Sequence, residues 1–223
     1  FGVEPVAELK ECLRNAAEGS DEDLARMYVN VTDNLTLFAC GGDDLFSYAA
    51  SGDVYEKAIN RIMKTYPVVI VDLSYAPIAV RQRLTERSHE IIVVATPELP
   101  SLRMARTVLN DLKTRRGVND GSVDLIVNKR GRISKGEISD KDIVAALDHT
   151  PQAYVDYQAE LFHRAETAGE PAFKQKGGEA IVENLLPLIK KVTGFKGSGR
   201  KNNVEKNEGG LIGRLLSGLQ KKE

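Results

Sequence analysis

Continuous runs of apolar residues predict three β-strands that are buried on both faces. Such runs, with no alternation of polar residues, are typical of parallel strands covered by helices on each side. They occupy residues 68–73, 91–95 and 123–127. The first run is the strongest, and we expect it to form a central strand of the sheet.

Apolar residues spaced three or four positions apart predict helices around these strands. The clearest helix spans residues 101–114, between the second and third strands. Ser20 with Asp23, and Ser139 with Asp142, resemble helix N-caps. Further helices are expected at residues 4–17, 20–28, 54–63, 139–147, 158–168 and 178–193, and short strands at 35–40 and 154–155. Pro187 should kink or split the last helix.

Strands that alternate with helices at these lengths build right-handed βαβ units. The sequence therefore predicts an α/β fold with an open, mostly parallel sheet flanked by helices. We assign residues 1–193 to this domain. Residues 194–210 are rich in Gly, Lys, Asn and Ser and are expected to form a flexible linker.

The segment after the linker, residues 211–223, predicts a basic amphipathic helix. Its aliphatic residues share one helical face: Leu211, Ile212, Leu215, Leu216 and Leu219. Such a helix suits contact with a membrane surface or with a partner protein. The alternative is a helix that folds back on its own domain, against which the long polar linker argues.

Charge divides the chain into an acidic body and a basic tail. The 223 residues carry 31 basic and 32 acidic side chains, a net charge of −1. Seven basic and three acidic residues follow position 193, so the tail carries +4 and the body −5. An acidic body argues against general nucleic-acid binding.

No apolar run reaches the roughly 18 residues of a membrane-spanning helix, and no signal peptide is recognisable. Cys12 and Cys40 are far apart in the sequence, and we expect reduced thiols rather than a disulfide framework. The three histidines form no metal-binding motif. These features predict a cytoplasmic globular protein.

Asp72 is the first candidate for chemistry. It follows four apolar strand residues, 68–71, as the aspartate of a Walker B element does. A carboxylate at the carboxyl end of a central strand can hold Mg²⁺ or its water beside nucleotide phosphates. The alternative is an aspartate that only caps the turn after the strand.

Asn128 is the second candidate, because it ends the predicted strand at residues 123–127. An amide side chain offers both a donor and an acceptor, which suits the edge of a purine base. The alternative is an asparagine that tolerates a left-handed turn. We identify no catalytic residue and no Ser/His/Asp arrangement.

A Walker A loop requires a Gly-Lys pair, and the chain has none. Lys176-Gly177-Gly178 imitates such a loop, but no strand precedes it. We therefore expect no phosphate cradle within these residues.

Several segments together resemble the MinD/ParA group of deviant P-loop ATPases, and most closely its CpaE/TadZ branch of pilus-assembly proteins. In order, they read YPVVIVDL (66–73), RQRL (81–84), IIVVATPELPSLR (91–103) and IVN (126–128). The resemblance covers residues 1–193 and is most specific over residues 96–103.

This resemblance implies a P-loop NTPase-like domain that binds ATP and Mg²⁺ in the full-length protein. Asp72 would be the Walker B aspartate and possible Mg²⁺ ligand, and Asn128 would contact the base. The chain opens at Phe1 without a methionine, and the first strands and the Walker A loop would lie upstream of it. We accordingly expect no ATP hydrolysis by this chain alone.

The implied function is the assembly and polar localisation of Flp (tight adherence) pili and the related secretion machinery, by dimerisation and docking. The expected partners are a second copy, proteins of that machinery and, through the terminal helix, the membrane. The protein would be cytoplasmic, or peripheral at the inner membrane or cell pole.

Two related functions stay open. One is a MinD-type ATPase that controls flagellar number or division-site placement, and the other is a ParA-type partitioning protein. The residues after Asp72 read Ser74-Tyr75-Ala76-Pro77, whereas related ATPases commonly carry a glycine in this switch segment. The departure argues against a mobile switch that senses the γ-phosphate.

Overall fold

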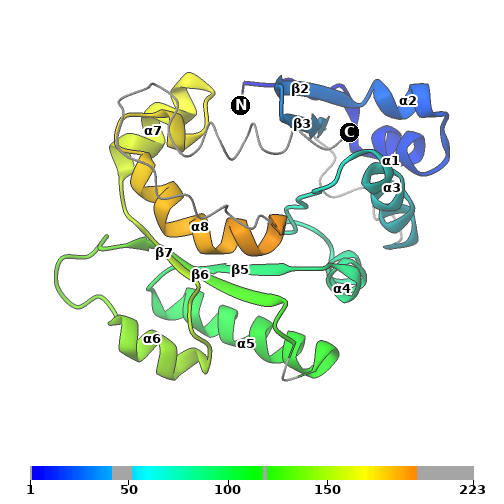
Figure 1. Ribbon diagram of the computed structural model, residues 1–223. Coiled ribbons are helices and arrows are strands. Elements are labelled where there is room, and N and C mark those ends of the chain that lie inside the picture. Colours follow the sequence, from blue (N-terminus) through cyan, green and yellow to red (C-terminus); the bar gives the residue numbers. More distant parts are fainter. Residues whose placement is uncertain (1, 42–51, 118–119, 195–223) are drawn as a thin grey trace.

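The computed structural model describes residues 2–41, 52–117 and 120–194 (Figure 1). The helices are α1 (Leu9–Glu18), α2 (Asp21–Ala25), α3 (Gly52–Thr65), α4 (Ile78–Arg87), α5 (Leu99–Arg116), α6 (Asp140–Leu147), α7 (Ala159–Ala168) and α8 (Glu179–Thr193). The strands are β1 (Ala7–Glu8), β2 (Tyr28–Thr32), β3 (Leu35–Phe38), β4 (Cys40–Gly41), β5 (Ile91–Ala95), β6 (Val123–Arg130) and β7 (Ala153–Asp156). A short 3₁₀ turn spans Ala172–Lys174. Beyond Gly194, the predicted linker and the helix at residues 211–223 lie outside the described residues.

The main sheet has the strand order β5-β6-β7, and its strands are all parallel. Ala95 of β5 is level with Val127 of β6, and Ile126 of β6 with Ala153 of β7. Helices α5 and α6 cover one face of this sheet and α8 lies over the other (Figure 1). The predicted α/β fold with a parallel, helix-flanked sheet is therefore confirmed.

The core of the sheet lies under α5 and α6. It includes Leu109 of α5, Leu125 and Val127 of β6, and Ile143 of α6, each at most 1% exposed. Full burial of such side chains contributes about 1.5–3 kcal/mol apiece. The apolar stripe predicted for the helix at residues 101–114 is the face that α5 buries against the sheet.

Helix α8 is fixed to the other face by Lys191. Its ammonium donates to Asp124 Oδ2 (2.8 Å) and to the Gly121 carbonyl (2.5 Å), and Glu90 Oε2 lies 3.0 Å away. Burial opposes the charge on Lys191, but the hydrogen bonds to Asp124 and Glu90 outweigh it and raise the pKa of Lys191. α8 continues through Pro187, so of the two expected effects of this proline, a kink or a split, the split does not occur.

A second core joins α1, α2 and α3 next to the antiparallel β2–β3 hairpin. Its buried residues are Leu13, Ala16, Leu24, Ala58 and Ile62. This region contains two corrections. The first helix begins at Leu9 rather than at residue 4, because Ala7–Glu8 pairs with β4. The second helix ends at Ala25 rather than Tyr28, where β2 begins.

Helix α4, which the sequence analysis did not predict, packs against α3 and also contacts α5. Arg116 at the end of α5 makes much of the second contact. Its guanidinium donates to the carbonyls of Thr85 (2.7 Å) and Ser88 (3.0 Å) and to Ser122 Oγ (2.8 Å). One side chain therefore holds the carboxyl end of α4 and the start of β6 together.

The largest correction concerns residues 68–73, the expected central strand. They belong to no strand, and Ile70 is 88% exposed. β5 is the edge strand of the sheet, and its Ile92 and Val94 are 42% and 59% exposed. Within the described residues, the segment 68–73 thus has no strand neighbour and β5 has one on one side only, which explains why burial did not follow hydrophobicity. Among the described residues as a whole, no helix is both long enough and apolar enough to cross a bilayer.

Candidate functional site

The carboxyl ends of β5, β6 and β7 meet at one edge of the sheet, where α/β proteins bind ligands. The turn after β5 is fixed by two short contacts. Ser101 Oγ accepts a hydrogen bond from the Thr96 N–H (2.9 Å), and the Thr96 carbonyl accepts one from the Glu98 N–H (2.7 Å). Helix α5 starts immediately afterwards, so residues 96–103 form a rigid strand-to-helix corner at this edge.

Asn128 lies near the carboxyl end of β6, which continues to Arg130, beyond the strand end predicted at residue 127. It is level with Val155 of β7 and half-buried. Its Oδ1 accepts a hydrogen bond from the Lys129 N–H (2.8 Å), and Lys129 has a φ of 59°. The left-handed conformation thus falls on Lys129 rather than Asn128. The Asn128 amide nitrogen donates to no protein group within the described residues, so its two donors are available to a ligand.

Two arginines after Asn128 line the same edge. Arg130 bonds Asp156 (2.8 Å) and Asp140 (3.3 Å) and lies over the Tyr154 ring at 5.0 Å. The hydrogen bond to Asp156 is the main reason that the pKa of Arg130 is raised. Burial, followed by the charge of Asp140, raises the pKa of Tyr154.

Arg132 bonds Glu98 at 3.0 Å and lies 5.7 Å from the centre of the Tyr157 ring. Glu98 follows β5, Arg132 follows β6 and Tyr157 follows β7. The three side chains therefore link the carboxyl ends of all three strands. Neither arginine, Tyr154 nor Tyr157 was singled out from the sequence, because only the strand pairing brings them together.

Asp72 ends the extended segment at residues 68–71 and is exposed. Its Oδ1 accepts hydrogen bonds from Ser74 Oγ (2.6 Å) and the Ser74 N–H (2.9 Å), and these bonds lower the pKa of Asp72. The side chain therefore caps its own turn, as the alternative interpretation expected. Among the described residues, none bonds the Oδ2 atom, which leaves it open to a ligand, and no contact joins Asp72 to Asn128.

The described part of the chain contains no cluster of side chains suited to a metal ion. The Lys176-Gly177-Gly178 motif does not form a phosphate-binding loop either. No group of three or more His, Cys, Asp or Glu side chains in residues 2–41, 52–117 and 120–194 could hold a metal ion. Gly178 is the N-cap of α8 and lies against the Ala172–Lys174 turn, as a helix start rather than a phosphate loop. The five aliphatic residues predicted for membrane or partner contact, 211–219, lie outside the described residues.

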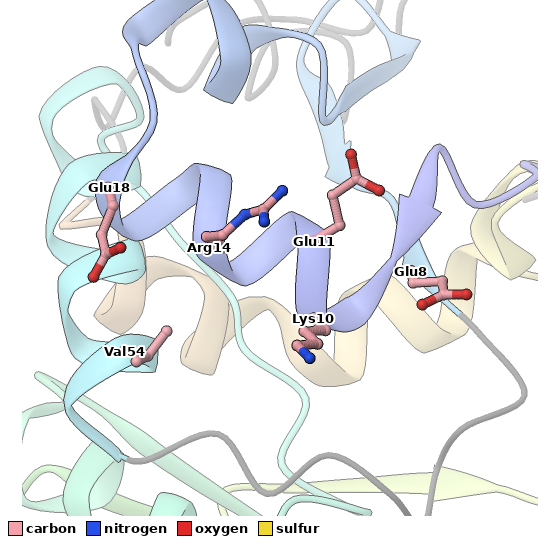
Figure 2. Close-up of a pocket in the computed structure, with 6 residues that line it drawn as sticks. All are labelled: Glu8, Lys10, Glu11, Arg14, Glu18 and Val54. Atoms are coloured by element: carbon pink, nitrogen blue, oxygen red, sulfur yellow. The ribbon is translucent and has the colours of Figure 1, made fainter.

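A shallow pocket lies on α1, next to the start of α3, and not at the sheet edge (Figure 2). Its lining is almost entirely charged: Glu8, Lys10, Glu11, Arg14, Glu18 and Val54. Asp72 and Asn128 are not among the lining residues, and the pocket has no aromatic surface for a base.

No family model matches the sequence, and no curated protein matches it significantly. Solved structures do match the fold. A ParA family ATPase from Chlorobium tepidum TLS superposes with a TM-score of 0.70 at 18% identity, over 84% of this chain and 77% of that one. The cell division ATPase MinD of Pyrococcus furiosus gives 0.60 at 15% identity, over 81% and 75%.

The MinD cell division protein of Aquifex aeolicus gives a TM-score of 0.58 at 16% identity, over 90% of this chain and 85% of that one. At these identities the likeness concerns the fold. The chain has the α/β fold of ParA and MinD ATPases, which is P-loop NTPase-like.

Proposed function

We propose that residues 1–193 are the greater part of an ATP- and Mg²⁺-binding P-loop ATPase domain whose phosphate loop is supplied from outside this chain. The observation that carries the proposal is a pair of apolar segments with strand edges left open among the described residues: residues 68–71, which belong to no strand, and β5, which pairs with β6 on one side only. A parallel sheet normally buries such segments on both sides. One further apolar strand between them would cover Ile70 and Val94 and deliver its loop to the carboxyl edge.

The chemistry of the two candidate residues fits a nucleotide, with Asn128 at the carboxyl edge of the sheet and Asp72 brought there once residues 68–71 join the sheet. The Asn128 amide donors are free for the acceptor atoms of a purine, and Asp72 Oδ2 is free for Mg²⁺ or its water. When bound, Mg²⁺ neutralises charge on the phosphates. Because the chain has no phosphate loop of its own, it should bind ATP poorly by itself.

The biological role that we propose is that of a CpaE/TadZ-like factor for the assembly and polar localisation of Flp pili. The support is the resemblance in residues 96–103, which form the corner between β5 and α5. The protein would act as a homodimer, and its segment at residues 211–223 would dock on the membrane or the machinery. Residues 194–210 would serve as the linker between the two.

A nucleotide-binding assay tests the proposal that the domain binds ATP and Mg²⁺. The chain would be produced with the coding sequence that precedes Phe1 and titrated with a fluorescent ATP analogue. Asn128→Ala should weaken binding about tenfold, the loss of one or two hydrogen bonds. Asp72→Asn should remove the Mg²⁺ dependence. Asn110→Ala, on the exposed side of α5, is the matched control and should change neither quantity.

Equal affinity of wild type and Asn128→Ala would refute the base-contact role. An upstream sequence with neither an apolar strand nor a glycine-rich Lys-Ser/Thr loop would refute the ATPase proposal. The role is tested by deleting the gene and counting pili and their polar placement. A change in flagellar number or division-site placement would indicate the MinD-type function instead, and salt-dependent DNA binding the ParA-type function.

A further inference from the structure

The two cysteines of the chain, Cys12 and Cys40, are 28 positions apart in the sequence and neighbours in the fold. Ala7 of β1 is level with Cys40 of β4 in a parallel pair. Cys12, in the first turns of α1, directs its Sγ at the Ala7 carbonyl at 3.5 Å. The two thiols are also close enough that each perturbs the pKa of the other. Both are free thiols in the structure, and the fold brings them together although the sequence separates them.

We propose that Cys12 and Cys40 form a dithiol site that a hydroperoxide oxidises to an intrachain disulfide. The proposal rests on the pairing of β1 with β4 and on the position of the Cys12 sulfur beside that pair. It does not depend on nucleotide binding.

The reaction proceeds in two balanced steps. In the first, one sulfur attacks a peroxide oxygen, the O–O bond breaks, and a sulfenic acid and water (or an alcohol) form. In the second, the other sulfur attacks the sulfenic sulfur, the S–O bond breaks, the S–S bond forms, and water leaves. The two thiols lose two electrons and two protons in total, and the peroxide is reduced by two electrons.

The surroundings of the two thiols determine how fast they are oxidised. Burial is the main cause that raises the pKa of both thiols, and the Glu11 carboxylate adds to the effect at Cys12. The thiolate is the reactive form, so little of it is present at neutral pH. Oxidation should therefore be slow at pH 7 and accelerate as pH rises, unlike that of an exposed low-pKa sensor cysteine. Cys12 is fully buried and Cys40 is partly exposed, so a peroxide reaches the pair from the Cys40 side.

The disulfide would close a loop that contains α2 and the β2–β3 hairpin. Closing such a loop restricts the unfolded chain and stabilises the folded one. Because the link joins α1 to β4, it would also hold the β1–β4 pair in register. We expect the oxidised protein to have a higher unfolding temperature than the reduced protein.

The test uses the full chain, treated with hydrogen peroxide and then blocked with iodoacetamide. Trypsin cuts after Lys10, Arg14, Arg26 and Lys57, so the disulfide would join the peptides 11–14 and 27–57. The expected results are this linked pair under non-reducing conditions, its loss on reduction, and a monomeric product. The rate at pH 9 should exceed that at pH 7 by roughly tenfold or more, in proportion to the thiolate fraction.

Cys12→Ala and Cys40→Ala are the matched controls, since each removes one sulfur with little change in volume. Neither variant should show the linked peptides or the rise in unfolding temperature on oxidation. The proposal is overturned if both wild-type thiols are alkylated after peroxide treatment. It is equally overturned if the product is a disulfide between two chains or a sulfinic acid without the intrachain link.

Discussion

Replacement of Lys191 by Met should destabilise the protein by about 3 kcal/mol, because it leaves the buried Asp124 without a cation. The Asp124 side chain is 3% exposed, whereas that of Lys191 is 34% exposed. Removing one partner of a buried ion pair costs about 3–5 kcal/mol. We expect the lower end, since water already reaches the lysine side of this pair. Methionine keeps most of the apolar stem, so lost packing adds little.

Urea unfolding followed by circular dichroism measures this change, with a similar slope expected for both proteins. For a chain of this size, 3 kcal/mol corresponds to a fall in Tm of about 6–12 °C. Lys190→Met is the matched control, because it removes the same charge from an exposed neighbour on α8. Asp124→Asn in the Lys191→Met background should recover much of the loss, since it removes the uncompensated charge.

The pH dependence provides a second check. The folded-state pKa of Lys191 is raised, so its contribution is complete below about 10.4, the unfolded value, and is lost as pH rises through the folded value. The difference between wild type and Lys191→Met should therefore be constant from pH 7 to 10 and shrink above that. If Lys191→Met unfolds within 1 kcal/mol of Lys190→Met, the Asp124 pair does not anchor α8 and the reasoning fails.

Three further predictions concern local contacts. Ser20→Ala should lower the free energy of unfolding by about 1 kcal/mol, because Ser20 Oγ accepts a hydrogen bond from the Asp23 N–H (3.1 Å) at the start of α2. An unchanged midpoint of urea unfolding would contradict this capping role. Arg116→Lys should lower the free energy of unfolding by about 2 kcal/mol, since one ammonium cannot replace the several hydrogen bonds of the guanidinium. A loss under about 0.5 kcal/mol would show that these bonds do not stabilise the fold. Hydrogen bonds from Ser122, then from Arg116, lower the pKa of Asp120 to about 2. The stabilising effect of this carboxylate is present above pH 3.8 and lost as pH falls through 2, so Asp120→Asn should flatten the acid side of a plot of Tm against pH.

The sequence predicted best those elements whose pattern depends on nearby contacts. Strands β5 and β6 and helix α5 form one βαβ unit, and the predicted stripe on α5 is the buried one. The capping pattern at Ser20 was also confirmed, including the reciprocal bond from the Ser20 N–H to Asp23. Local patterns of this kind depend on contacts within a few residues, which a sequence displays directly.

Prediction failed where structure depends on distant or external partners. Residues 68–71 have the composition of a buried strand, but a strand needs neighbours to pair with, and Ile70 has none. Strand β2 has only five residues and depends on pairing with β3. At the candidate site, Asn128 was proposed because it follows the apolar run of residues 123–127, and its contact with a base stays a prediction. The Arg132–Glu98–Tyr157 contacts join three separate loops, and only the strand order could reveal them.

The edge of β5 that no described residue covers also bears on how this chain behaves during synthesis and purification. An open strand with exposed Ile92 and Val94 presents backbone donors and acceptors to any other strand that it meets, including the same edge of another copy. The rate of pairing between two chains rises with the square of the protein concentration. The loss of monomer should therefore depend steeply on concentration. In the cell, the same edge would be a target for chaperones and proteases for as long as no strand covers it.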